Sequence, residues 1–246
     1  MFPEQVLAII YSLIACTATS IGMIIIWKYK EWGEKNVIYF MSFAAGLLLA
    51  VSILHIIPES FELNSSAPLC LLVGFLSFHA YDRVIDNHSF NNHDRKSARL
   101  YSLGIITAWG IGIHSFIDGV VYMITFSVSM FTGVVTSTAM VFHEIPEGII
   151  TFLLLREAGF SEKKSLAYSF LAAAISTPLG AIIAYPFVNN LDNTQLGILL
   201  GLSAGALLYV GASRLLPESE SGSVKYSLLT LGCGITLAII IILLGH

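Results

Sequence analysis

HSFIDG at residues 114–119 and HEIPEG at residues 143–148 are two similar polar motifs, and each lies in the middle of a long apolar stretch. Each motif contains a histidine and a carboxylate four residues apart, which is about one turn of an α-helix and therefore one helix face. The two stretches are neighbours in the sequence, so facing motifs would bring two imidazoles and two carboxylates to one point. This pattern predicts a metal-ion site between two helices, at membrane depth.

The composition around these motifs is that of an integral membrane protein. The 246 residues are 56% hydrophobic and 11% charged, with a mean hydropathy of +0.80. Soluble domains carry about 25% charged residues, so this chain lacks the side chains that would cover a water-facing surface. The first apolar run has no basic residue before it, which favours a retained span over a cleaved signal peptide. We expect a lipid bilayer around the protein and no nucleic-acid partner.

Eight apolar segments are long enough to cross a membrane as helices. Each holds 19–27 residues, and a helix rises ~1.5 Å per residue across a hydrocarbon layer of ~30 Å. Backbone groups in lipid must bond within their own segment, so we expect helices throughout. The predicted fold is an all-α integral membrane protein with one transmembrane domain over residues 1–246. The expected spans are residues 6–27, 36–57, 67–85, 100–126, 131–155, 164–188, 195–216 and 225–245.

The basic residues predict the orientation. All 12 lysines and arginines fall in, or directly beside, the loops that follow the first, third, fifth and seventh spans. The positive-inside rule places such loops in the cytoplasm, so both termini are expected on the outer side. The chain is compact, poor in charge and without a targeting extension, which favours the plasma (inner) membrane of a bacterium or archaeon.

The chain contains an internal repeat. AAGLLLAVSILHIIPES at residues 44–60 and SAGALLYVGASRLLPES at residues 203–219 are identical at eight of seventeen positions and share the ending Pro-Glu-Ser. The first segment runs from inside to outside and the second runs back, so the repeat would be inverted. Spans one to three then correspond to spans six to eight, and spans four and five are related across the same axis. Transporters built from inverted repeats bind their substrate near the midplane, where the halves meet.

The acidic groups of the motifs narrow the choice of ligand. Asp118, Glu144 and Glu147 each cost roughly 2.5–3.5 kcal/mol at the centre of a bilayer, and no lysine or arginine lies at that depth in the sequence. A cation from outside the chain would neutralise them. Imidazole with carboxylate suits Zn²⁺, Fe²⁺, Mn²⁺ or Co²⁺, whereas Mg²⁺ and Ca²⁺ prefer oxygen and Cu⁺ prefers sulfur. The alternative is a metal-free network of hydrogen-bonded histidines and acids.

The motifs also suggest how the ligands are shared. Glu144 lies about 100° around the helix from His143, so it would face a second position beside the first. Asp118 and Glu147 could bridge the two positions, and the glycine that ends each motif would allow close helix approach. The four ligands expected for the main ion are His114, Asp118, His143 and Glu147.

Together these features resemble the ZIP (Zrt/Irt-like) family of divalent-metal transporters, over essentially the whole chain. HEIPEG is similar to the family's fifth-helix pattern, and HSFIDG is less fully similar to the fourth-helix pattern His-Asn-x-Pro-Glu/Asp-Gly. The endings HIIPES (55–60) and RLLPES (214–219) are also similar. The resemblance implies a homodimer, a binuclear centre between the two central helices, and import of Zn²⁺, or of Fe²⁺, Mn²⁺, Co²⁺ or Cd²⁺, into the cytoplasm.

Some positions depart from the family pattern. Ser115 stands where an asparagine ligand is common, and Thr177 stands where several bacterial members have a glutamate before the proline. We therefore expect one strong site and a weaker auxiliary metal position near these two hydroxyls. His55 and Glu59 lie one helical turn apart near the outer end of the second span, and they are expected either on the ion's path or as a polar cap at the interface.

The residues alone leave two other functions open. His143-Glu144 is similar to the start of the HExxH pattern of zinc hydrolases, which would make the protein an intramembrane metal-dependent hydrolase. However, the fifth position of that pattern is Glu147, and Pro146 would break the helix that such an enzyme needs. We therefore expect no catalytic residue and no enzymatic activity. A metal-sensing receptor without ion flux is the remaining alternative.

Overall fold

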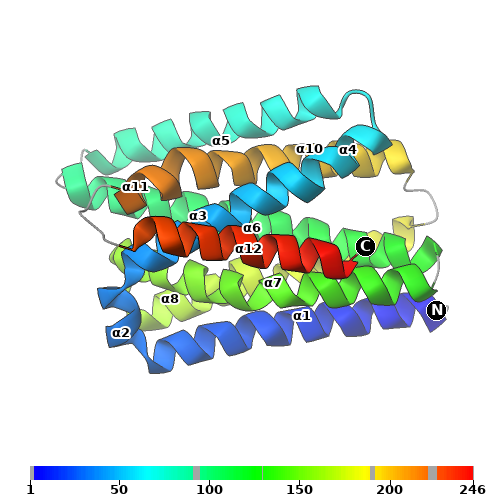
Figure 1. Ribbon diagram of the computed structural model, residues 1–246, viewed down its shortest axis with the longest axis horizontal. Coiled ribbons are helices and arrows are strands. Elements are labelled where there is room, and N and C mark those ends of the chain that lie inside the picture. The colour runs from blue at the N-terminus through cyan, green and yellow to red at the C-terminus, as the bar shows by residue number, and fades with distance from the viewer. Residues whose placement is uncertain (1–2, 91–94, 129, 189–191, 221–225, 246) are drawn as a thin grey trace.

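The structure, a computed structural model, describes residues 3–90, 95–128, 130–188, 192–220 and 226–245, and these residues form helices without any β-strand. The helices lie side by side along the long axis of the molecule (Figure 1). A short helix, α2 (Lys30–Lys35), joins the first two long rods. The unbroken rods are α1 (Pro3–Lys28), α5 (Ala67–Phe90), α6 (Arg95–Val128), α7 (Met130–Glu157) and α12 (Ser227–Gly245).

Three further long helices in the described chain are interrupted by a π-helical segment. They are α3 (Val37–Val51) with η1 (Ser52–Ile56) and α4 (Ile57–Leu63); α8 (Glu162–Ser169) with η2 (Phe170–Ala174), α9 (Ser176–Ala184) and the 3₁₀ turn η3 (Tyr185–Phe187); and α10 (Asn193–Leu208) with η4 (Tyr209–Leu215) and α11 (Leu216–Glu220). A proline clashes with the carbonyl four residues before it. For Pro58, Pro178 and Pro217 that carbonyl belongs to the π-helical stretch, so the wider winding relieves the clash.

The helices cover the described residues of the predicted spans except Asn36, Ile175, Val188 and Tyr226, which lie in turns or bends, and several helices extend beyond the spans. α6 begins at Arg95, before the predicted start at residue 100, because the helix continues into polar residues that hydropathy excludes. Residue 225, the first of the predicted eighth span, lies outside the described residues. Six described rods are long and apolar enough to cross a membrane: Glu4–Lys28, Val37–Leu63, Ala67–Ile85, Ser97–Ser127, Glu162–Phe187 and Asn193–Glu220, while Ser227–Leu243 is apolar but shorter. The prediction of an all-helical membrane protein is confirmed, whereas the count of eight spans stays a prediction.

Glycines allow the closest helix contacts on one side of the molecule. A Cβ atom added to Gly148 of α7 would lie 2.2 Å from the Thr19 carbonyl oxygen of α1. A Cβ added to Gly119 of α6 would lie 2.0 Å from the Thr177 carbonyl oxygen of α9. No side chain fits at these distances, so the backbones of α7 and α1, and of α6 and α9, are in direct contact.

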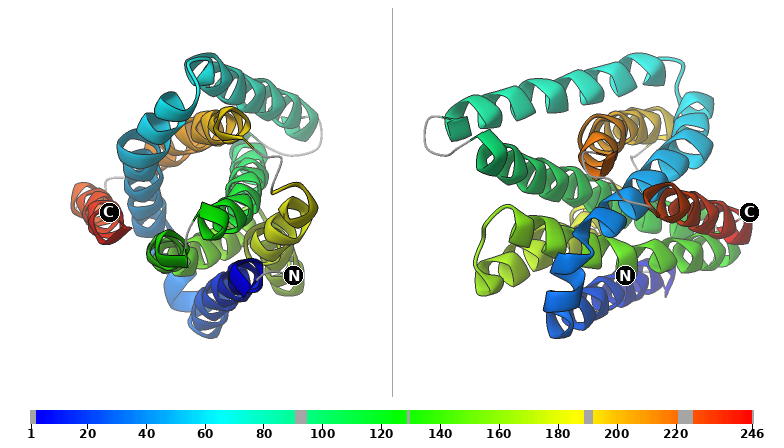
Figure 2. Two further views of the ribbon diagram at one scale, coloured as in Figure 1. Left: turned by 90° about the vertical axis from the view of Figure 1, so that its right-hand side faces the viewer. Right: turned by 60° about the vertical axis from the view of Figure 1, so that its left-hand side comes forward.

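The same kind of contact joins the helices on the other side. A Cβ on Gly46 of α3 would lie 2.2 Å from the Leu231 carbonyl oxygen of α12, and a Cβ on Gly205 of α10 would lie 2.1 Å from the Leu71 carbonyl oxygen of α5. Seen end-on (Figure 2, left), α5, α10 and α3–α4 lie on one side, α1, α7 and α8–α9 lie on the other, and α6 lies between them. α6 is therefore the helix around which both groups pack.

Candidate metal centre

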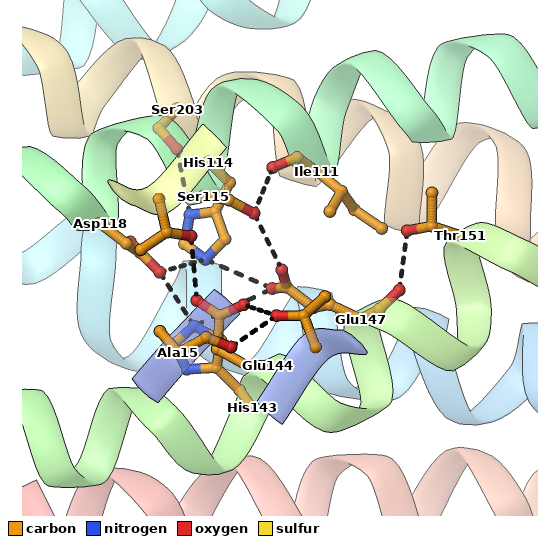
Figure 3. A network of polar contacts seen from close by, with 12 residues as sticks. Ala15, Ile111, His114, Ser115, Asp118, His143, Glu144, Glu147, Thr151 and Ser203 are labelled. Atoms are coloured by element: carbon orange, nitrogen blue, oxygen red, sulfur yellow. Dashed lines mark hydrogen bonds and ion pairs between the residues drawn. The ribbon is translucent and has the colours of Figure 1, made fainter. Parts of the chain in front are cut away.

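The two sequence motifs face each other across the contact between α6 and α7 (Figure 3). His143 Nε2 lies 2.9 Å from Asp118 Oδ2, and His114 Nε2 lies 3.5 Å from the same oxygen. Glu147 Oε1 lies 3.6 Å from His114 Nε2 and 4.0 Å from His143 Nε2. The structure thus brings together the four side chains predicted to hold the main ion, two from each helix.

These separations suit a tetrahedral ion. Ligand atoms ~2.0–2.1 Å from a tetrahedral Zn²⁺ lie ~3.3 Å from one another, and the observed separations of 2.9–4.0 Å lie on both sides of that value. Ligand atoms of His114, His143 and Glu147 all fall within 4.8 Å of one another, as do those of Asp118, His143 and Glu144. The two sets share His143, so the second set lies beside the first, as the helix geometry of Glu144 predicts.

All five groups are shielded from water. The exposed fractions of His114, Asp118, His143, Glu144 and Glu147 lie between 0% and 7%. Three carboxylates so close together repel one another strongly at low dielectric, and buried charges are stable only when they are paired or bind a metal. A divalent cation would supply the missing positive charge.

Hydroxyl groups contact the acids on the side away from the imidazoles. Glu144 Oε2 accepts a hydrogen bond of 2.5 Å from Thr19 Oγ1, and Glu144 Oε1 accepts one of 3.3 Å from Thr177 Oγ1. Ser115 Oγ donates to Glu147 Oε2 at 3.3 Å. The structure thus places Ser115 and Thr177 against the acids, where the sequence predicts an auxiliary position. Both oxygens of Glu144 accept hydrogen bonds, which fix the orientation of its carboxylate.

Two residues at this centre were not predicted. Thr19 comes from α1, and Ser203 of α10 lies with its Oγ 3.4 Å from His114 Nδ1. Such a contact orients the imidazole so that Nε2 points to the cluster. The only feature of the sequence that could have indicated either residue is a hydroxyl group in an apolar span. This feature does not distinguish a residue at the metal centre from one that faces outward. Thr17 has the same feature, yet it is exposed and donates to the Leu13 carbonyl of its own helix.

A cavity of about 410 Å³ connects the cluster to the end of the bundle where α4 meets α5. His55 and Glu59 lie on its wall rather than in the cluster, and their side chains lie 3.6 Å apart, between His55 Nε2 and Glu59 Oε2. Glu62, which was not predicted, follows Glu59 by three residues on the same helix face. The polar residues of the lining are His55, Glu59, Glu62, His114, Asp118, Thr125 and His143.

Towards the opposite end of the bundle, helices pack closely against α6. α6 and η4 pack so tightly that a Cβ on Gly110 would lie 2.9 Å from Val210 Cγ2. Further along, the buried Asp82 of α5 accepts a 2.6 Å hydrogen bond from Ser102 of α6 and another from the Tyr209 hydroxyl. The same carboxylate lies 3.3 Å from Arg214 Nη1. One buried acid therefore ties α5, α6 and η4 together.

Comparison with known proteins gives a consistent assignment. The family model described as "ZIP Zinc transporter" matches residues 82–241, which is more than half of the chain. A protein named zinc transporter ZupT from Streptococcus mutans is 27% identical over 234 residues, covering 87% of both chains. A ZupT from Chlorobium limicola is 28% identical over 255 residues, covering 93% of this chain and 94% of the relative.

A more distant relative has a broader name. The metal cation symporter ZIP14 of Bos taurus is 30% identical over 183 residues, which cover 69% of this chain and 34% of that protein. The relatives named here carry the names of transporters, and the family match includes both motifs of the centre. The chain therefore belongs to the ZIP zinc transporter family.

Proposed function

We propose that this protein carries Zn²⁺ across the membrane and into the cytoplasm, with His114, Asp118, His143 and Glu147 as the ligands of the ion in transit. The observation that carries the proposal is the pair of facing motifs, whose ligand atoms lie 2.9–4.0 Å apart at the inner end of a cavity. Fe²⁺, Mn²⁺, Co²⁺ and Cd²⁺ suit the same ligands and are proposed as further substrates. The names of the relatives favour zinc.

The proposed topology has eight spans, in one domain, with both termini outside the plasma (inner) membrane. α7 has 28 residues and α12 has 19, which correspond to about 42 Å and 29 Å of helix. Both lengths suit a hydrocarbon layer of ~30 Å. With the six other rods they account for the eight apolar segments, and the distribution of lysine and arginine supports the orientation. The cavity then opens to the outside.

The packing supports an inverted repeat. Gly46 and Gly205 occupy the same position of the sequence repeat, and each contacts a carbonyl of the helix that the repeat predicts, α12 for α3 and α5 for α10. The closing glycines of the two motifs behave likewise, since Gly148 contacts α1 and Gly119 contacts α9. The repeat relates spans one, two, three and four to spans six, seven, eight and five, respectively. When the spans are exchanged in this way, each contact of a pair becomes the other contact of that pair. If the two halves resembled each other only by chance, these carbonyl contacts would not need to correspond.

The auxiliary position and the homodimer belong to the same proposal. Glu144, Ser115 and Thr177 would border a second ion of lower affinity, because hydroxyls replace stronger ligands there. The resemblance to the family favours a homodimer. An apolar row on α5, which includes Leu69 and Leu76 at 64% and 51% exposure, supplies a face that lipid or a second copy would cover.

The proposal is tested by zinc uptake into vesicles that contain the purified protein. Wild-type vesicles should take up radioactive zinc, whereas Glu147→Ala should abolish uptake because it removes an anionic ligand. Glu31→Ala, on the exposed surface of α2, should behave as the wild type. Wild-type protein that binds zinc without any uptake would indicate a sensor, and hydrolysis of lipid or peptide without uptake would indicate an enzyme. Either result would overturn the proposal.

A further inference from the structure

Helix α7 presents three faces, two of which pack extensively against α6 and α1, while α12 and α3 contact the third face less extensively. At ~100° per residue, the ligands His143 and Glu147 lie on a face directed to α6. Ile145 and Gly148 lie on a second face, where the α1 backbone contacts them. A Cβ on Gly22 of α1 would lie 2.3 Å from the Ile145 carbonyl oxygen. The third face carries Pro146 and Ile149, roughly 100° from each of the others.

The third face of α7 borders a cavity of about 500 Å³, which lies between α2, α3, α7 and α12. This volume is within the range of ~300–1,000 Å³ that is usual for small-molecule sites. The lining is dominated by apolar and aromatic groups, which include Tyr39, Phe40, Phe43, Pro146, Ile149 and Ile150.

Polar side chains border one end of the cavity. Trp32 and Asn36 of the α2 region and Tyr226 beside α12 border it at the end of the bundle that carries Lys28 and Lys35. In Figure 1 this is the end where α2 lies and α12 begins. The side chains of Trp32 and Tyr226 are 58% and 50% exposed. Aromatic residues with a polar atom are typical of the boundary between hydrocarbon and headgroups.

We propose that the acyl chain of a phospholipid from the cytoplasmic leaflet occupies this cavity and supports the third face of α7. The inference rests on the membrane placement given under the proposed function. Phospholipid is what surrounds the mouth of the cavity at that depth. An unfilled apolar cavity loses dispersion contacts along its whole lining. The tail would lie against Phe43 and Ile149, and the headgroup would lie beside Asn36 and Tyr226.

Filling the cavity bears on metal binding because Pro146 lies between two ligands of the metal centre. α7 is held by α6 and by α1, so an object on its third face limits its movement away from both. The acyl chain would pack against α7 and thereby restrict the positions of His143 and Glu147. Loss of the lipid should therefore weaken zinc binding although no ligand of the metal is changed.

The test uses the full-length protein in vesicles of phosphatidylethanolamine and phosphatidylglycerol. A small fraction of the phospholipid carries a diazirine at the end of one acyl chain, and labelled peptides are mapped by mass spectrometry after illumination. Wild-type protein should be labelled at residues 39–43, 146–150 and 226–230 at least tenfold above the lipid-facing α5. Labelling no greater than on α5 would overturn the proposal.

Variants on α12 separate the cavity from the surrounding lipid. Thr230→Trp places bulk in the cavity and should reduce labelling there tenfold, whereas Leu229→Trp, at a neighbouring position that is 64% exposed, should leave it unchanged. Phe43→Ala widens the cavity and should keep or increase labelling. Undiminished labelling in Thr230→Trp, or cross-links between two copies of the chain across the cavity, would contradict the proposal.

The lipid proposal and the transport proposal fail in different ways. Labelling is measured without zinc, so a protein labelled in the cavity that does not carry zinc would support the lipid site and overturn transport. Zinc titration of delipidated protein adds the functional readout. Affinity should fall at least tenfold and recover when phosphatidylglycerol is returned. A zinc affinity that does not depend on lipid would overturn the proposal that the lipid restricts the position of the metal ligands.

Discussion

Gly119→Ala tests whether the position of α6 determines the geometry of the metal centre. The added methyl carbon would lie 2.0 Å from the Thr177 carbonyl oxygen and 2.7 Å from the Ala181 nitrogen. Because ordinary contact begins at 3.4 Å, α6 and α9 must separate by about 1.4 Å there. Metal ligands tolerate roughly 0.2 Å, and Asp118 precedes the substituted residue, so the ligand set cannot remain intact if α6 moves.

The size of the effect follows from the cost of overpacking. Extra methyl groups in a packed interior cost about 1–3 kcal/mol. If the strain is relieved at the metal centre, zinc affinity should fall by roughly 5- to 150-fold. If α9 moves instead, only the contact between Thr177 and Glu144 is lost and the main ion should bind almost normally. The result therefore shows whether α6 or α9 moves to accommodate the added methyl group.

The assay is calorimetric titration of the purified protein with zinc, with thermal unfolding measured in parallel. Gly232→Ala is the matched control, because no atom lies within 4 Å of its added Cβ. The control should bind zinc as the wild type does, and it should gain up to ~1 kcal/mol from helix propensity. Gly119→Ala with both wild-type affinity and the melting temperature of the control would refute the close contact between α6 and α9.

Further predictions concern individual side chains. Glu147→Gln preserves the shape of the side chain but removes an anionic ligand, so zinc affinity in a titration should drop at least tenfold, and Glu31→Gln should leave it unchanged. Protons compete with zinc for the same imidazole and carboxylate lone pairs, so affinity should decline as the pH falls from 7.5 to 5.5; a constant affinity would argue against these ligands. Thr177→Glu should raise the zinc content per chain in elemental analysis, and an unaltered content would mean that Thr177 does not border a second ion. Asp82→Asn leaves Arg214, whose side chain is 11% exposed, without its buried counterion; this should cost up to ~3–5 kcal/mol of stability, and an unchanged melting temperature would contradict it.

The parts of the metal centre that depend on local geometry could be predicted from the sequence. The spacing of His114 and Asp118 fixes one helix face, and so does the spacing of His143 and Glu147. Since their helices are consecutive, the two faces can meet without knowledge of the rest of the fold. The family pattern added Thr177, because its position before a proline could be recognised.

Contacts between distant helices could not be predicted in this way. Thr19 lies 125 residues from its partner Glu144, and Ser203 lies 89 residues from His114. A hydroxyl buried in an apolar span has no periodicity that distinguishes it from one that faces lipid. The π-helical stretches were also not predicted, because a proline in a sequence signals a disturbed helix but not how the helix responds. Pro146 illustrates this. The expectation that it breaks its helix is wrong, because α7 continues through it as an α-helix. The difference from the HExxH pattern therefore rests on Glu147 at the fifth position.

The pairing of α6 with α7 has a consequence for how the protein is made. Its histidines and acids come from consecutive helices, and the contact between Asp118 and His143 spans only 25 residues. Contacts of short sequence separation form early, because little chain entropy is lost in closing them. As the ribosome releases the chain, this hairpin can assemble before α8 to α12 have been synthesised. A nascent chain would then already offer the four proposed zinc ligands, and zinc bound at that stage would ease the burial of its acids in lipid.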